Sequence, residues 1–302
     1  MVVELSEQQL DEIISRYKHD GYVIIRGGLS DEEMAPLIAQ WHRLRDPLRE
    51  GDTVDGIKRD NLYVHGKLPS PLGDVMHHPL ISTVANKLLG PDIAIYMNRL
   101  NVKDQALTEH VHLHQDLPYF NGGGNKINFF IALQDTNINN GAMTFVPGSH
   151  RLGLVDRKTI DISKHPEFDA IVPSLRPGDL LISDILLWHS SVPNTQGTDR
   201  VILQIIVQPA DDGSYYPHSV PEPHLITGQW RTDQFTPWTA APTSTGNQSS
   251  MSGEAAMGAA TTSIRIVTSR SKLIARCKAA VPVVVKQHIR RVLSTAKRKL
   301  GK

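Results

Sequence analysis

The hydrophobic pattern of the first residues predicts an amphipathic helix from Ser6 to Lys18. Its apolar positions recur at helical spacing and form one stripe, made of Leu10, Ile13, Ile14 and Tyr17. Ser6 followed by Gln9 fits a capping box, in which two side chains satisfy free backbone groups at the helix start. Gly21 is expected to end this helix, because glycine readily adopts the left-handed conformation of a helix stop.

A strand and a second helix are predicted next. Residues 22–25, Tyr-Val-Ile-Ile, are apolar and β-branched, which favours a strand. Ser30 with Glu33 fits another capping box, and the stripe of the helix that follows is Met34, Leu37, Ile38 and Trp41. The polar segment 46–67, which contains Tyr63, has no clear period, and we interpret it as a loop near an active site that could form a lid.

Short strands separated by Gly, Pro and Asn turns are predicted from about residue 93 to 207. The clearest runs are 126–133, 179–183 and 200–208. This texture is typical of a β sandwich or barrel. Two helices before many strands therefore predict a β-rich α+β domain over residues 1–239.

Composition changes after this domain. Residues 240–263 are small and polar, so they are predicted to form a flexible linker. From Ser263 to Lys302 there are 12 Lys and Arg and no Asp or Glu, which leaves 20 basic and 31 acidic residues, a net of −11, in the remainder. Residues 264–302 are predicted to form a basic helical tail, amphipathic after Pro282, with an apolar stripe of Val285, Ile289, Val292, Leu293, Ala296 and Leu300.

Three partners fit this tail: an anionic membrane surface, the acidic body or a neighbouring protein, and an acidic carrier or nucleic acid. The net charge of the whole chain is only +1, so nucleic acid is not expected as its main partner. A single cysteine, Cys277, excludes an intramolecular disulfide and suits a reducing cytosol. Without a signal-peptide pattern or an apolar run long enough to span a bilayer, the expected location is cytoplasmic, with peripheral membrane contact as an option.

A metal site is predicted around His114-Gln-Asp116. Residues two apart in a strand face the same way, so His114 and Asp116 could offer an imidazole and a carboxylate to one ion. His189, 75 residues downstream, is the candidate third ligand. Two imidazoles and one carboxylate on one face of an octahedral ion leave open positions, which suits non-haem Fe(II) oxygen chemistry.

The crowding of histidines leaves a second ligand set open. His110, His112, His114 and Asp116 alternate, and His112-Leu-His114 could be a cupin-type pair for another metal. A cupin would supply a Glu a few residues later, and none occurs between Gln115 and Gly141. This favours His114 and Asp116.

A co-substrate site is predicted from Arg200. It follows His189 by 11 residues, after a turn at 193–197, and a hairpin could return it beside the metal. A guanidinium there would bind the distal carboxylate of 2-oxoglutarate with two parallel hydrogen bonds. The Ser191 hydroxyl could add a contact. The alternative is that Arg200 is a surface charge at a strand end.

Together these residues resemble the phytanoyl-CoA dioxygenase family of 2-oxoglutarate oxygenases over roughly residues 10–210. The order and spacing of several further segments agree with that family: 20–25 (DGYVII), 112–116 (HLHQD), 132–135 (ALQD), 140–143 (NGAM), 147–150 (PGSH), 177–179 (PGD) and 189–194 (HSSVPN).

The resemblance implies a double-stranded β-helix, the cupin-like jelly roll, flanked by N-terminal helices. It implies that His114, Asp116 and His189 bind iron, and that Arg200 and Ser191 hold the C5 carboxylate of 2-oxoglutarate. Asn101 looks like a further co-substrate contact. Phe130 stands where relatives often have Trp, so its contact with the co-substrate departs from the pattern. Because related halogenases replace the carboxylate with a small residue, Asp116 implies hydroxylation or a related oxidation.

The expected function is a 2-oxoglutarate-dependent dioxygenase that uses Fe(II) and O2, oxidises a small-molecule metabolite, and releases succinate and CO2. The fold does not determine the substrate. Side chains that could face the cavity suggest a polar one: His110, His112, Asn128 and Gln134. Two other functions remain open: a cupin-like isomerase or hydrolase that uses His112 and His114, and a non-catalytic jelly-roll binding protein.

Overall fold

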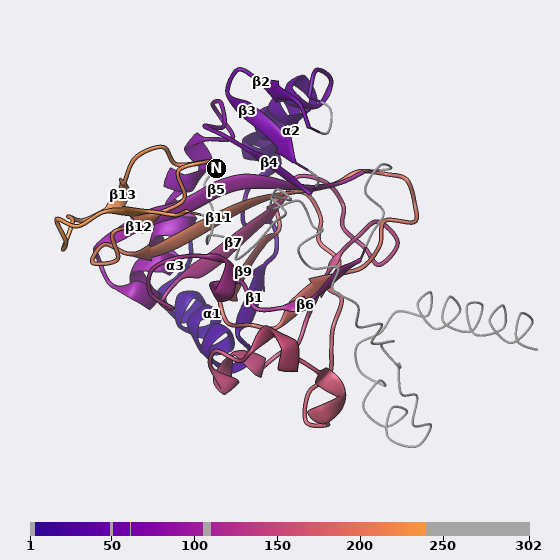
Figure 1. Cartoon of the computed structure of the whole chain (residues 1–302), viewed down its shortest axis with the longest axis vertical. Coiled ribbons are helices and arrows are strands. Elements are labelled where there is room, and N and C mark those ends of the chain that lie inside the picture. Colours follow the sequence, from indigo (N-terminus) through magenta and orange to yellow (C-terminus); the bar gives the residue numbers. More distant parts are fainter. Residues whose placement is uncertain (1–3, 49–50, 61, 105–109, 240–302) are drawn as a thin grey trace, which may run out of the picture. The chain divides into compact units, whose positions relative to one another are not determined.

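The computed structural model describes residues 4–48, 51–60, 62–104 and 110–239 (Figure 1). The linker 240–263, the tail 264–302 and Cys277 lie outside the described residues, so these parts of the sequence analysis stay predictions. In the described residues no helix is long and apolar enough to cross a membrane.

Three α-helices accompany the strands: α1 (Glu7–Asp20), α2 (Asp31–Arg45) and α3 (Pro79–Leu89). The first two begin as predicted. Ser6 Oγ accepts a hydrogen bond from the backbone N–H of Gln9, and the Gln9 side chain accepts one from the Ser6 backbone. Ser30 and Glu33 form the same reciprocal box at the start of α2. These caps satisfy N–H groups that have no partner inside the helix.

The largest sheet has nine strands, in the order β1-β9-β7-β11-β5-β4-β3-β2, with β13 also paired to β5. A second sheet has the order β6-β10-β8, and β12 pairs with β14. Their bounds are β1 (Tyr22–Ile25), β2 (Thr53–Val54), β3 (Ile57–Asp60), β4 (Tyr63–His65), β5 (Ile93–Lys103), β6 (Val111–His114), β7 (Ile127–Ala132), β8 (Met143–Phe145), β9 (Leu180–Asp184), β10 (His189–Ser191), β11 (Arg200–Pro209), β12 (Ser214–Tyr215), β13 (His224–Thr227) and β14 (Thr236–Pro237).

Five short 3-10 helices complete the described part: η1 (Asp74–His77), η2 (Leu117–Tyr119), η3 (Ser149–Leu152), η4 (Arg157–Thr159) and η5 (Ile162–Lys164). The β-rich α+β prediction is confirmed, and the fold is the expected jelly roll. The strands predicted at 126–133, 179–183 and 200–208 correspond to β7, β9 and β11, with ends that differ by one residue.

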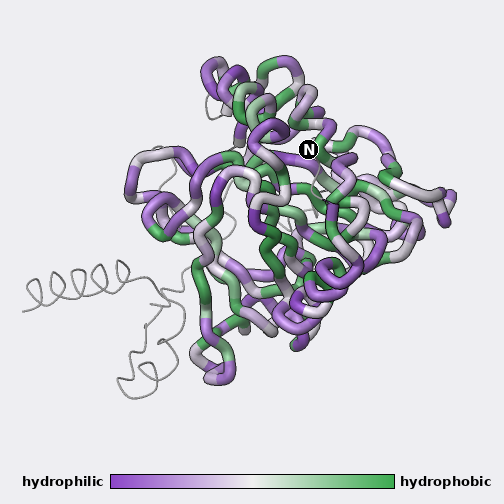
Figure 2. The backbone as a smooth tube through the Cα atoms, turned by 180° about the vertical axis from the view of Figure 1, so that it is seen from behind, coloured by the Kyte–Doolittle hydropathy of each residue, from purple (hydrophilic) through white to green (hydrophobic). Residues whose placement is uncertain are grey.

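Both faces of the central strands β5, β7, β9 and β11 are buried, which explains their nearly continuous apolar sequences. In β11, Val201, Leu203 and Ile205 belong to one hydrophobic cluster with residues of all three α-helices. Ile202 points to the other face and joins β8 residues of the small sheet in a second cluster. Figure 2 shows the corresponding hydrophobic segments running through the sheets.

The face of the large sheet that turns toward the small sheet also carries polar residues. Alternation along β11 places Arg200 and Gln204 on the same side as Ile202. Asn101 on β5 and Asn128 on β7 reach this side as well, since both belong to one hydrogen-bonded group with Gln204. The space between the two sheets is therefore the polar part of the interior.

Two predictions about connections are wrong. Segment 46–67 is not simply a loop, because its described residues contain β2, β3 and β4, and β4 pairs with β5 at Tyr63 and Val64. His189 and Arg200 do not lie on two strands of one hairpin. β10 pairs with β6 and β8, whereas β11 pairs with β5 and β7, so the turn after His189 carries the chain from the small sheet to the large one.

We expect Gly21→Ala to destabilise the domain. Gly21 ends α1 with φ 78°, and an added Cβ would lie 2.4 Å from His150 Nδ1. Gly27→Ala is a matched control, since its φ is 59° but an added Cβ meets nothing within 4 Å. Both variants should lose about 1–2 kcal/mol from the left-handed backbone. Overpacking should cost Gly21→Ala a further ~1–3 kcal/mol in urea unfolding, and equal losses would contradict this.

Candidate metal centre and co-substrate pocket

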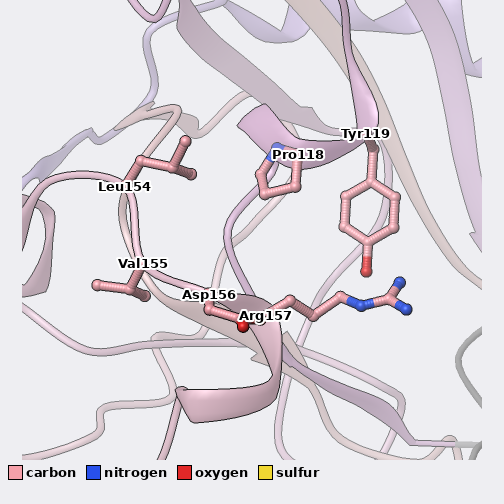
Figure 3. A pocket seen from close by; sticks show the side chains of 6 residues that line it. All are labelled: Pro118, Tyr119, Leu154, Val155, Asp156 and Arg157. Atoms are coloured by element: carbon pink, nitrogen blue, oxygen red, sulfur yellow. The ribbon is translucent and has the colours of Figure 1, made fainter.

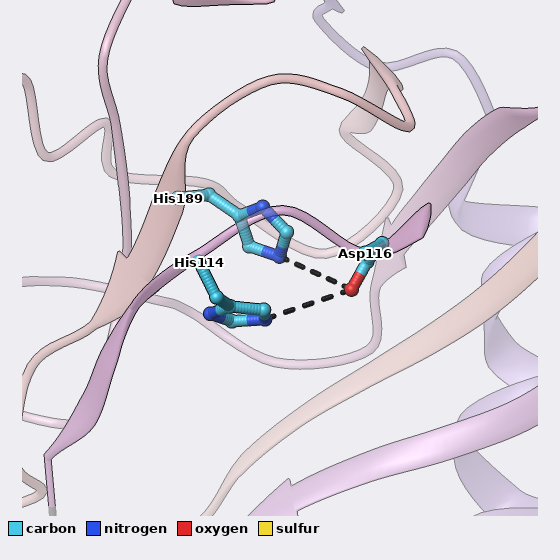
Figure 4. Close-up of side chains that lie close together, drawn as sticks. All are labelled: His114, Asp116 and His189. Atoms are coloured by element: carbon cyan, nitrogen blue, oxygen red, sulfur yellow. Dashed lines mark ion pairs between the residues drawn. The ribbon is translucent and has the colours of Figure 1, made fainter. Parts of the chain in front are cut away.

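His114, Asp116 and His189 converge, as predicted. One ligand atom from each lies within 4.8 Å of the other two, and no other such group of three occurs among the residues that the structure describes. The Nε2 atoms of both histidines are 3.6 Å from Asp116 Oδ1 (Figure 4). Three donors facing one point on one side is the arrangement that a 2-His-1-carboxylate iron site requires.

Strand pairing brings the two histidines together. His114 at the end of β6 is the register partner of His189 at the start of β10, and their ring centroids are 4.2 Å apart. Asp116, however, lies beyond β6, so the prediction that both residues of the motif share one strand face is wrong. Its backbone is αR, with φ −77° and ψ −34°, at the residue before η2. This turn, and not strand alternation, directs the carboxylate toward the imidazoles.

Backbone carbonyls orient both rings. His114 Nδ1 donates to the carbonyl of His112 at 2.7 Å, and His189 Nδ1 donates to that of Leu187 at 3.0 Å. Because a carbonyl only accepts, each Nδ1 carries the proton and each Nε2 keeps a free lone pair for a metal.

The charge state of the site also suits a cation. Burial, followed by the neighbouring His114, lowers the pKa of His189, which favours the neutral imidazole that a metal needs. Burial alone would raise the pKa of Asp116, but His189 and His114, together with Arg99, hold it below its usual value. The carboxylate is therefore ionised, and the residues present fit an iron(II) ion.

The cupin-type alternative finds no support in this geometry. His112 is exposed, and its ring packs against that of His110 at a centroid distance of 5.2 Å. Within the described part of the chain, neither residue belongs to a cluster able to hold a metal. The His112 contribution to the site is its backbone carbonyl.

Arg200 is a buried arginine, not a surface charge. It is 2% exposed, and its hydrogen bonds go to two backbone carbonyls, from Nε to Gly141 at 3.1 Å and from Nη1 to Asn101 at 3.2 Å. No carboxylate of the described residues forms an ion pair with it. Burial lowers its pKa to about 10, so the guanidinium remains charged at neutral pH. A buried charge of this kind calls for an anionic partner, which the distal carboxylate of 2-oxoglutarate would provide.

The other predicted co-substrate residues lie on the elements around Arg200. Ser191 is buried on β10. The backbone N–H of the next residue, Val192, donates to the carbonyl of Ala142. Ala142 directly follows Gly141, whose carbonyl accepts a hydrogen bond from Arg200. Asn101 Oδ1 on β5 is buried and has no hydrogen-bond partner among the described residues, as expected of a group that awaits a ligand. Phe130 on β7 packs in the hydrophobic cluster between the sheets, so it forms an apolar wall.

Arg99 and Gln204 also belong to this interior, although the sequence analysis missed them. Arg99 is 6% exposed, donates from Nε to Gln204 Oε1 at 3.0 Å, and lies 3.7 Å from the centre of the Tyr63 ring. No ion pair joins Arg99 to a carboxylate of the described residues. The signal was a charged or amide side chain within an otherwise apolar strand, which is hard to interpret without the sheet register.

Asn128, which the sequence suggested as cavity-facing, is fully buried and donates from Nδ2 to Asp116 Oδ2 at 2.9 Å. Gln134 is partly buried, and its Oε1 has no partner among the described residues. His110 is partly buried. Of the four suggested substrate-facing residues, Asn128 is thus the one whose side chain is hydrogen-bonded to the metal triad in the described part of the chain.

A pocket of about 540 Å³ lies beside η2 (Figure 3). It is lined by Pro118, Tyr119, Leu154, Val155, Asp156 and Arg157. The Tyr119 ring packs edge-on against His114 at 5.8 Å between centroids, and its hydroxyl end points toward the Arg157 guanidinium. One residue that lines the pocket, Tyr119, is therefore in contact with a predicted iron ligand.

Several known proteins are similar to this chain in sequence. The profile of the phytanoyl-CoA dioxygenase (PhyH) family matches residues 17–202. The multifunctional dioxygenase ausE of Emericella nidulans is 26% identical over 209 residues, which cover 63% of this chain and 70% of that one. The ectoine dioxygenase of Bordetella bronchiseptica is 29% identical over 150 residues, 46% of this chain and 48% of its own.

Solved structures of known proteins are similar to this chain in fold. The non-heme alpha ketoglutarate dependent epimerase SnoN from nogalamycin biosynthesis superposes with a TM-score of 0.55 and 25% identity, over 68% of this chain and 85% of that one. EctD from S. alaskensis with bound Fe has a TM-score of 0.57 and 22% identity over 69% and 78%, which shows the fold. Because the family profile covers more than half of the residues, this chain belongs to the phytanoyl-CoA dioxygenase family and is a 2-oxoglutarate-dependent dioxygenase that requires iron(II) and O2.

Proposed function

We propose that this chain hydroxylates a small polar metabolite, with His114, Asp116 and His189 as its iron ligands and Arg200 as the anchor of 2-oxoglutarate. The observation that carries this proposal is a three-donor site in the same inter-sheet space as a buried arginine that has no carboxylate partner among the described residues. The overall reaction consumes the substrate, O2 and 2-oxoglutarate, and yields the alcohol, succinate and CO2. When bound, iron(II) activates O2 with electrons that 2-oxoglutarate supplies as it loses CO2.

The residues of the chain position the reactants. The His114 and His189 imidazoles and the Asp116 carboxylate would hold iron(II), and this set of three ligands would leave room for the co-substrate and O2. Arg200, with Ser191 and the unpartnered Asn101 Oδ1, would hold the far end of 2-oxoglutarate. The apolar cluster that includes Phe130 keeps water away from the co-substrate. Asp116 favours hydroxylation over halogenation, because its carboxylate would bind the metal where related halogenases have a small residue.

The substrate is proposed to carry a carboxylate or a similar oxyanion. Arg99 is the basis for this, since it is a second buried guanidinium, near enough to Asp116 to influence its pKa and without a carboxylate partner in the described residues. Among the described residues, the hydrogen bond that Arg99 donates uses Nε, which leaves its terminal guanidinium edge available. A planar oxyanion is the ligand that such an edge binds best.

Succinate release across a panel of metabolites tests the function. We expect carboxylic acids to raise succinate formation in wild type and their methyl esters to be poor substrates. Arg99→Gln should raise the KM for the best acid by about 10- to 100-fold, since it removes a charge-assisted hydrogen bond, whereas the exposed Arg43→Gln should not change it. If acids and esters perform equally, the oxyanion assignment is wrong. If no compound raises succinate above the level without substrate, the proposed hydroxylation fails.

A further inference from the structure

A chain of buried amides links the metal triad to the far side of the cavity. Asn128 Nδ2 donates to Asp116 Oδ2 at 2.9 Å, and Gln204 Nε2 donates to Asn128 Oδ1 at 2.8 Å. Gln204 Oε1 accepts from Arg99 Nε and from Asn101 Nδ2, both at 3.0 Å. The residues of this row lie on three adjacent strands, β5, β11 and β7, so the hydrogen bonds run across the middle of the large sheet.

The groups at the two ends of this row of amides fix the direction of its hydrogen bonds. An arginine Nε can only donate, so Gln204 must turn its oxygen toward Arg99 and its NH2 group toward Asn128. Asn128 must then accept through Oδ1 and present its own NH2 to Asp116. An ionised carboxylate can only accept, so the far end agrees. Neither amide can flip without placing two donors or two acceptors face to face.

These hydrogen bonds give the two carboxylate oxygens of Asp116 different contacts. Oδ2 is engaged by Asn128, whereas Oδ1 is the oxygen that lies 3.6 Å from Nε2 of both histidines. Asn128 and Gln204 are 0% and 2% exposed, so water cannot easily replace either amide. The carboxylate is thereby held in the rotation that offers one oxygen to the metal.

We infer that Gln204 is a positioning residue for iron, which acts through Asn128 to hold Asp116 in its ligating orientation. This inference rests on the proposed function, because it takes Asp116 as a metal ligand. The same Gln204 oxygen also holds Arg99 and Asn101, so one side chain orders the metal carboxylate and the polar groups across the cavity. Hydrogen-bond partners of metal ligands typically change metal affinity by about 10- to 100-fold when they are removed.

Gln204→Glu tests the inference in the full-length protein. Glutamate keeps the shape and still accepts from Arg99 and Asn101, but it cannot donate to Asn128. Asn128 then faces a carboxylate on each side, and its amide cannot direct NH2 to both while keeping its oxygen satisfied. We expect cobalt(II), used as a probe that needs no turnover, to bind about 10- to 100-fold more weakly, with altered visible d–d bands.

Gln208→Glu is the matched control. Gln208 lies on the same strand and is equally buried, and its Nε2 donates to the backbone carbonyls of Asp212 and Ser214. Loss of these two donated hydrogen bonds should change the free energy of unfolding but not the affinity for cobalt(II). If Gln204→Glu does not fold, Gln204→Met supplies the same test, because it also lacks the donor to Asn128.

A double-mutant cycle separates action through Asn128 from general packing damage. If Gln204 acts through Asn128, adding Gln204→Met to Asn128→Ala should change cobalt(II) affinity by less than about threefold. Wild-type affinity in Gln204→Glu and Gln204→Met, or additive losses in the cycle, would overturn the inference. Failure of the wild type itself to bind cobalt(II) would instead contradict the proposed metal site.

Discussion

Asp116→Ala is expected to lower succinate formation by at least about a hundredfold, because loss of a ligand should exceed the effect of losing a group that only orients one. The carboxylate is the one anionic donor of the triad. Without it, two neutral imidazoles would have to hold a divalent cation alone. The same replacement at His112 should retain most activity, since its side chain is exposed and only its carbonyl contacts His114.

The pair of variants distinguishes two metal sites. Succinate formation and iron(II) binding should both fall in Asp116→Ala and persist in His112→Ala, with circular dichroism and urea unfolding showing that both variants are folded. The reverse result, activity without Asp116 and none without the His112 imidazole, would indicate a cupin-type site at residues 112 and 114.

Arg200→Met is expected to raise the KM for 2-oxoglutarate by about 10- to 100-fold or more, because it would remove the proposed bidentate, charge-assisted contact. The apo-protein should be no less stable than wild type. Its guanidinium is buried without a carboxylate partner in the described residues, so methionine relieves a desolvated charge while losing two bonds to backbone carbonyls. The KM for 2-oxoglutarate is thus expected to rise, while the free energy of unfolding of the apo-protein stays the same or increases.

Initial rates at varied 2-oxoglutarate and urea unfolding of the apo-protein measure the two effects. Arg200→Lys keeps the charge but not the planar fork, so its KM should lie between those of wild type and Arg200→Met. A loss of more than about 2 kcal/mol in apo Arg200→Met, with an unchanged KM, would show that this arginine is structural.

The first two helices could be predicted because their signals are local, whereas α3 (Pro79–Leu89) was not predicted. The capping boxes at Ser6 and Ser30 and the stop at Gly21 depend on residues within a few positions of one another. Segment 46–67 could not be assigned in this way. Its strands are two to four residues long and join the large sheet through the pairing of β4 with β5, which begins more than 20 residues later.

His114, Asp116 and His189 converge as the sequence predicted, but for a partly wrong reason. The spacing of His114 and Asp116 suggested one strand face, whereas the chain turns before Asp116. Arg99 and Gln204 could not be found from local pattern. In a strand buried on both faces, which side a polar residue occupies depends on register and on bulges such as the one at Ile206/Val207.

An anaerobic titration with iron(II) and 2-oxoglutarate tests the central claim most directly. Wild type should develop the weak visible charge-transfer band of iron(II) with a bound 2-oxo acid, and His189→Ala should not. Arg200→Met should require a higher 2-oxoglutarate concentration to reach the same band. A folded wild-type protein that shows no band at saturating iron(II) and 2-oxoglutarate would contradict the assignment of this site.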